Sequence, residues 1–134
     1  MLSLTEIENR IFEKLATDIT DVAVVKYPDD YLNYVLTHPK GAVLLKYDGE
    51  QDNAPNVAAQ FVLQTYTVTV ISKALRVSSG AYDIMDEVRT SLTNDLYINN
   101  QRLYVLNVMP LGAIEGKWYY EMTFMLPIMR LLGE

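Results

Sequence analysis

Two stretches of the chain repeat apolar residues every three or four positions, which is the spacing of a helix with one buried face. The first stretch carries the stripe Leu4, Ile7, Ile11 and Leu15. Ser3 and Glu6 have the spacing of a capping box, in which each side chain bonds the other residue's backbone N–H. We therefore expect an amphipathic helix that begins after Ser3 and lies on a sheet.

The second helical stretch follows a break at residues 77–80. Its apolar stripe consists of Ala81, Ile84, Met85, Val88 and Leu92. Ser79 is placed to cap this helix, and Asp83 and Asp86 lie in its first turns, where the helix dipole favours negative charge. The helix is expected to end near residues 94–95.

Alternation of apolar and polar residues predicts strands elsewhere. The expected strands are residues 21–27, 42–47, 61–72, 102–109 and 117–126. Loops are expected at residues 48–56 and 111–116, and a short helical turn at residues 31–36. Pro127 should end the last strand, because proline cannot donate to a strand ladder. The core face of this strand is predicted to carry Trp118, Tyr120, Met122, Phe124 and Leu126.

The order of these elements does not alternate strand and helix, which argues against a doubly wound parallel sheet. We expect an α+β fold with a mostly antiparallel or mixed sheet of about five strands. Both helices should pack on one face of this sheet. The 134 residues fit a single domain, residues 1–134, and no internal repeat or linker is visible.

The third expected strand contains QTYTVTVISK, in which threonine alternates with larger apolar residues. Tyr66, Val68 and Val70 should share one face, and the other face should carry Thr65, Thr67 and Thr69. A threonine face suits contact with a second subunit, because it leaves no exposed apolar patch in the free chain. An outer sheet face of a monomer explains the pattern as well.

Charge and composition exclude several classes of protein. The net charge is −6, and the lysines and arginines form no basic stripe, which argues against a general nucleic-acid binder. The chain has no cysteine, so disulfides and thiolate chemistry are excluded. Neither a signal peptide nor an apolar run of the roughly 20 residues needed to span a bilayer is found. The 10 tyrosines indicate some use at half-wet interfaces.

The sequence predicts no catalytic residue, no cofactor and no metal site, and hence no enzyme. His38 is the single histidine and lies in a predicted loop, and no phosphate-binding glycine motif is present. Turns, solvation or helix dipoles explain the carboxylate groups, which are Asp29 with Asp30, Glu50 with Asp52, and Asp83 with Asp86 and Glu87.

The succession of elements resembles the Mu-like family of small phage tail proteins and, more distantly, the tail terminators of long-tailed phages. The matching segments are hydrophobic and structural, and they cover nearly the whole chain. They are residues 22–25, HPKGAVLLKY at 38–47, VISK at 70–73, the helix AYDIMDEVRTSL after Gly80, and residues 103–108 and 118–126.

This resemblance implies a structural protein of a bacteriophage or prophage, which is expected to bind no substrate and no cofactor. A tail terminator is expected to be a homo-oligomer, a hexameric ring that caps the tail tube and joins it to neck or head-completion proteins. DNA would pass through without specific binding, and no membrane is involved. The protein would act in the virion tail, after assembly in the cytoplasm of the bacterial host.

The resemblance favours the interface interpretation of the threonine strand. The predicted subunit interface is Thr65, Thr67, Thr69 and Tyr66, and the predicted lumen or partner loop carries Asp48, Glu50 and Asp52. Two alternatives stay open. One is another tail completion, neck or baseplate component, and the other is a small ligand-binding domain or enzyme.

Overall fold

The computed structural model describes residues 2–28, 36, 38–53 and 59–131, except for the side chains of residues 52, 53, 59–61 and 129–131. Its helices are α1 (Leu4–Asp18) and α2 (Ala81–Thr93). Its strands are β1 (Ala23–Lys26), β2 (Gly41–Asn53), β3 (Ala59–Ser72), β4 (Tyr104–Ile114) and β5 (Lys117–Leu131).

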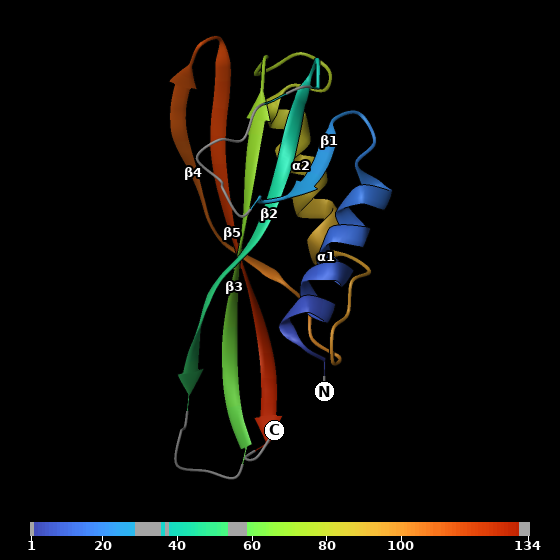
Figure 1. Cartoon of the computed structure of the whole chain (residues 1–134), viewed down its shortest axis with the longest axis vertical. Coiled ribbons are helices and arrows are strands. Elements are labelled where there is room, and N and C mark those ends of the chain that lie inside the picture. Colours follow the sequence, from blue (N-terminus) through green and yellow to red (C-terminus); the bar gives the residue numbers. More distant parts are fainter. Residues whose placement is uncertain (1, 29–35, 37, 54–58, 132–134) are drawn as a thin grey trace.

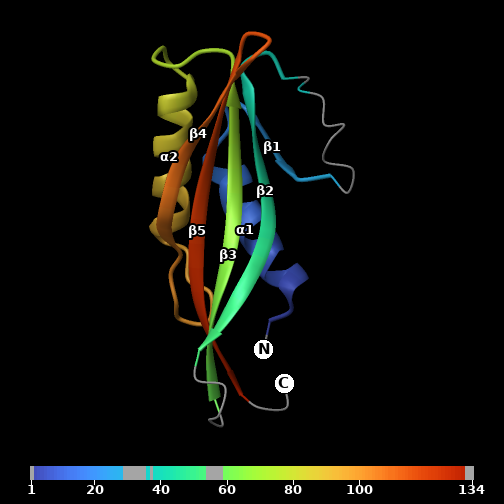
Figure 2. The ribbon, with the colours of Figure 1, turned by 90° about the vertical axis from the view of Figure 1, so that its left-hand side faces the viewer.

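The strands form one sheet in the order β1-β2-β3-β5-β4. The β1–β2 pair is parallel and the other pairs are antiparallel, so the mixed α+β fold predicted from the sequence is confirmed. Both helices cover the same face of the sheet (Figure 1), and Figure 2 views the opposite face with the helices behind it. No helix in the described part of the chain is long and apolar enough to cross a membrane.

The main core lies between the helices and the inner face of β2, β3 and β5. Each helix contributes most of its predicted stripe, with Ile7, Ile11 and Leu15 from α1 and Ile84, Val88 and Leu92 from α2. Leu4, the first residue of the predicted α1 stripe, is instead 41% exposed. The sheet contributes Val43, Leu45, Tyr66, Val68, Val70, Met122, Phe124, Leu126 and Ile128. Burial of these side chains is the main force that holds the helices on the sheet.

The start of α1 is confirmed and the cap of α2 is corrected. Ser3 and Glu6 form both hydrogen bonds of the capping box. In α2 the N-cap residue is Gly80, with no side-chain cap, and not Ser79 as predicted. Ser79 instead adopts a left-handed conformation with φ 63°, and its backbone N–H donates to Asp83 Oδ2 at 3.2 Å.

Strand β2 continues through most of the segment predicted to be a loop. Its pairing with β3 shifts register between Tyr47 and Glu50, where Gly49 has φ +111°, and then resumes as far as Asn53. The predicted loop is therefore wrong up to Asn53, because β3 supplies backbone partners for this polar segment. The turn expected at residues 31–36 lies, apart from Leu36, outside the described residues.

Strand β4 begins two residues later than predicted, but the β4–β5 hairpin extends further than predicted at its turn and at the C-terminal end of β5. The loop expected at residues 111–116 is wrong, because β4 runs to Ile114 and the turn contains Glu115 and Gly116, with φ 53° and 78°. Strand β5 also continues beyond Pro127, which pairs with Leu63. Strand β4 pairs with β5 only as far as Met125, so Pro127 lies where one edge of β5 has no ladder partner in this sheet.

Trp118 is the one member of the predicted β5 core face that is exposed. Met122, Phe124 and Leu126 are fully buried, and Tyr120 packs partly buried against the core. Trp118 lies opposite Ala113 near the hairpin turn and is 37% exposed. Alternation places it on the correct face, but at this end of the strand the main core does not enclose it.

Candidate interaction surfaces

The side chains of β3 alternate between the two faces of the sheet, as the sequence predicts. Val68 and Val70 are buried against the helices. Thr67 and Thr69 lie on the other face, where Thr67 pairs with Thr123 of β5 and Thr69 with Leu44 of β2. Neither α1 nor α2 covers this threonine face (Figure 2).

A polar network joins β2, β3 and Tyr27, the residue after β1, across the threonine face. Thr67 Oγ1 donates to Asp48 Oδ2 at 3.0 Å, and Lys46 Nζ lies 3.8 Å from Asp48 Oδ1. The same ammonium group is 5.2 Å from the centre of the Tyr27 ring, in cation–π geometry. The Tyr27 hydroxyl is hydrogen-bonded to Thr69 Oγ1 at 2.6 Å. The hydroxyls of Thr67 and Thr69 thus form hydrogen bonds within the chain.

The threonines are less exposed than the interface prediction requires. Thr67 is 1% exposed and Thr69 is 4% exposed. Thr65 is half-buried, and its hydroxyl donates to Met125 Sδ at 3.2 Å. Their neighbours, including Tyr27, cover them in the isolated chain.

Tyr66 lies on the helix-facing side and has no exposed surface. Its hydroxyl donates to Gln64 Oε1 at 2.8 Å, and its ring meets Tyr47 edge to face with ring centres 5.5 Å apart. This residue belongs to the main core of the chain, on the face opposite to Thr67 and Thr69. The alternation of side chains along β3 predicts the face on which Tyr66 lies. A tyrosine suits this buried position, because its ring packs in the core while its hydroxyl finds a hydrogen-bond partner.

The three acidic residues predicted for a lumen loop do not form one group. Asp48 lies on the threonine face, bonded to Thr67. After the irregularity at Gly49, Glu50 pairs with Gln64 on the helix-facing side and accepts a hydrogen bond from its amide at 3.4 Å. The side chain of Asp52 lies outside the described residues. One extra residue in the strand is enough to send Asp48 and Glu50 to opposite faces.

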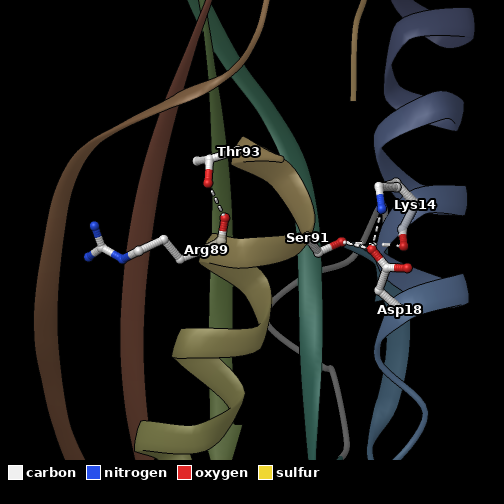
Figure 3. A network of polar contacts seen from close by, with 5 residues as sticks. All are labelled: Lys14, Asp18, Arg89, Ser91 and Thr93. Atoms are coloured by element: carbon white, nitrogen blue, oxygen red, sulfur yellow. Dashed lines mark hydrogen bonds and ion pairs between the residues drawn. The ribbon is translucent and has the colours of Figure 1, made fainter. Parts of the chain in front are cut away.

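A buried serine connects the two helices (Figure 3). Ser91 of α2 is 3% exposed, and its hydroxyl donates to Asp18 Oδ2 of α1 at 2.8 Å. Lys14 also bonds Asp18, one helical turn away. Hydrogen bonds from Lys14 and then Ser91 lower the pKa of Asp18 below its ordinary value. Sequence reasoning missed this contact, because it joins residues 73 positions apart.

Carboxylates also gather where the chain enters α2. The Ser79 hydroxyl donates to Asp21 Oδ2 at 2.9 Å, and the Ser79 N–H donates to Asp83. Partial burial, followed by the charges of Asp21 and Asp83, raises the pKa of Glu87. No group of three or more metal-ligating residues in the described part of the chain has the geometry to hold a metal.

His38 has a local role in the backbone before β2. Its Nδ1 accepts a hydrogen bond from the Lys40 N–H at 3.1 Å. This bond supports the bend that leads into Gly41. Gly41 lies so close to β3 that an added Cβ would meet the Ile71 carbonyl oxygen at 2.2 Å.

Strand β4 exposes apolar side chains that the sequence analysis did not single out. It is an edge strand, and Tyr104, Leu106, Met109, Leu111 and Ile114 are between 44% and 60% exposed. We call these five residues the β4 patch. A run of 11 residues without a charge, interrupted by Pro110 and Gly112, was the available signal, since proline and glycine in a strand mark an edge or a bulge.

Comparison with known proteins places the chain in a family. The family model described as Gp37 protein matches residues 11–132. The chain belongs to the Gp37 family. The chain is also similar in fold to a chain of the virion of a native gene transfer agent particle, with a TM-score of 0.65 and 15% sequence identity. The similarity covers 92% of this chain and 95% of that chain. No curated protein matches it in sequence.

The fold similarity extends over nearly all of both chains. At this identity the likeness concerns fold alone. Membership of a Mu-like tail family, expected from the resemblance, stays a prediction.

Proposed function

We propose that this member of the Gp37 family is a structural component of a phage-type virion, and more specifically the tail terminator. The observation that carries the proposal is the fold shared, over nearly the full length of both chains, with a protein of a gene transfer agent virion. The role is non-enzymatic: the protein would act by binding its own copies and neighbouring virion proteins.

The proposed assembly is a ring of six copies on the end of the tail tube, each a single domain spanning residues 1–134. Rotational symmetry in such a ring requires one surface of each copy to meet a different surface of the next. The neck or head-completion proteins would bind the side of the ring away from the tube. Assembly would take place in the host cytoplasm and the product would reside in the virion tail.

Charge supports the passage of DNA through this ring. Each chain carries −6, and six copies multiply this charge around one opening. A negative wall repels phosphates, so DNA would slide without binding. We propose that the acidic half of β2, with Asp48, Glu50 and Asp52, lines the opening or a partner surface, from both faces of the sheet instead of from one loop.

The function is tested by mixing the purified protein with tail tubes and imaging their ends by negative stain. We expect rings at the end of the tube that joins the head, together with an arrest of tube growth. Binding at the opposite end would indicate a baseplate component, and binding to isolated heads would indicate a neck component. Absence of binding to any virion part would contradict the proposal.

A further inference from the structure

Half of the exposed large apolar residues in the described part of the chain lie on one strand. These are the five residues of the β4 patch, and the other five are spread over α1, α2, β5 and two connections. Tyr104, Met109 and Ile114 pair with Met125, Glu121 and Lys117 of β5, which places them on the threonine face. The exposed part of that face is therefore its β4 margin.

The backbone of β4 is poorly suited to the addition of another strand. Its register with β5 shifts twice, between Val105 and Asn107 and between Pro110 and Gly112. Bulges and a proline are devices that keep edge strands from pairing with other chains. The residues left without a partner in β5 are Leu106 and Leu111, which are 59% and 51% exposed. This edge presents apolar side chains while disrupting its own backbone ladder.

Charge distinguishes the patch from the rest of the surface. Two copies of a chain with a net charge of −6 repel each other. Strand β4 has no charged residue, whereas the opposite edge strand, β1, carries Lys26. The five side chains of the patch carry no charge, so a second copy can contact them without forming a like-charge pair with them, while Glu121 and Lys117 of β5 lie beside the patch.

The exposed area of the β4 patch is also large enough to form part of an interface. Five side chains exposed to this degree present on the order of 500 Å² of surface, which is within the range of the largest apolar patches of monomers. Each partner of a standard stable interface buries roughly 800 Å², so the patch would form the apolar centre of such an interface.

We propose that the β4 patch is the contact by which one copy of this chain binds the next, through side chains and without extension of the sheet. As the contact within a ring, this rests on the proposed function. The contact replaces Thr67 and Thr69, which are buried, as the centre of the subunit interface on the threonine face.

Sedimentation equilibrium of the whole chain, at concentrations up to about 1 mM, tests the contact. The wild type should self-associate. Leu111→Glu should weaken association at least about tenfold, because it places a carboxylate in an apolar contact. Leu106→Glu is the second variant and should have the same effect. Val77→Glu is the matched control, since Val77 is 62% exposed and lies outside β4, in the connection between β3 and α2, and it should associate like the wild type.

The inference is overturned if the wild type stays monomeric at about 1 mM, or if both leucine variants associate as the wild type does. Val77→Glu weakening association equally would overturn it too, because added charge rather than the surface would then be responsible. Retained self-association with lost tube capping in Leu111→Glu would assign the patch to a tail protein instead. Tube capping by the wild type is measured separately, so a failure of the proposed function can be distinguished from a failure of the β4 contact.

Discussion

Phe124 is fully buried on the helix-facing side of β5, where it pairs with Tyr66 of β3. Phe124→Ala should lower the free energy of unfolding by about 3–5 kcal/mol, because both the loss of buried apolar surface and the cavity left behind destabilise the fold. Denaturant melts measure this loss. Val77→Ala, at an exposed position, is the control and should cost less than about 0.5 kcal/mol. A cost below about 1 kcal/mol for Phe124→Ala would contradict the described core.

Asp18 gives the helix pair a dependence on pH. Its pKa is lowered in the fold by Lys14 and Ser91, so its stabilising contribution is present above the unfolded-state pKa, about 3.9, and is lost as pH falls through the folded value. Ser91→Ala should move the pKa of Asp18 back toward its ordinary value. Carboxyl titration by NMR measures this change. An identical Asp18 titration in wild type and variant would show that Ser91 does not bond the carboxylate in solution.

At the scale of elements, α1 depends on its N-terminal cap. Ser3→Ala removes the acceptor of the Glu6 N–H and should cost about 1 kcal/mol of unfolding free energy. Thr5→Ala is the control, because this residue is exposed and lies past the cap in the first turn of the helix. Thermal melts followed by circular dichroism compare the two. Equal effects of the two substitutions would contradict the capping role of Ser3.

The strands β2 and β3 are joined on the outer face by the network around Thr67, which also includes Tyr27 after β1. Thr67→Val keeps the shape and removes the donor to Asp48, and should cost about 1 kcal/mol. Thr65→Val should cost less, because its hydroxyl bonds a thioether sulfur, a weak acceptor. Urea melts measure both. A larger loss for Thr65→Val would show that the network contributes little.

Thr67→Arg is consequently an unsuitable probe of the subunit interface. At 1% exposure the arginine would displace Asp48, Lys46 or the β5 neighbours, and the melting temperature would fall together with any assembly. Probes of assembly belong at exposed positions of β4, where a charge alters the surface and leaves the core intact.

At the scale of the whole molecule, net charge and the apolar edge oppose each other. Raising salt from about 0.01 M to 0.15 M shortens the screening length from about 30 Å to about 8 Å, which weakens repulsion between chains of charge −6. Self-association through the β4 patch should therefore become stronger as salt rises. Light scattering over a salt series measures this. Dissociation on adding salt would indicate an ionic contact and contradict an apolar one.

Periodicity was sufficient for the elements and for the faces of their side chains. The stripes of both helices, the capping box of α1 and the alternation of β3 depend on neighbours a few positions apart, so the local sequence contains them. Strand ends were mispredicted where polar or proline-containing residues obtain partners from a distant strand. The part of β2 after Gly49 and the part of β5 after Pro127 both pair with β3.

The sequence by itself determined the fold class, the core stripes and the acidic, cysteine-free composition. Tertiary structure alone decided which surface is exposed. The sequence does not fix the burial of threonine and tyrosine in QTYTVTVISK, because burial depends on which distant residues lie over them. Tyr27 is hydrogen-bonded to Thr69, Asp48 to Thr67, and the helices enclose Tyr66. Leu106 and Leu111 are exposed on the edge strand β4, at the two register shifts where neither residue has a partner on β5.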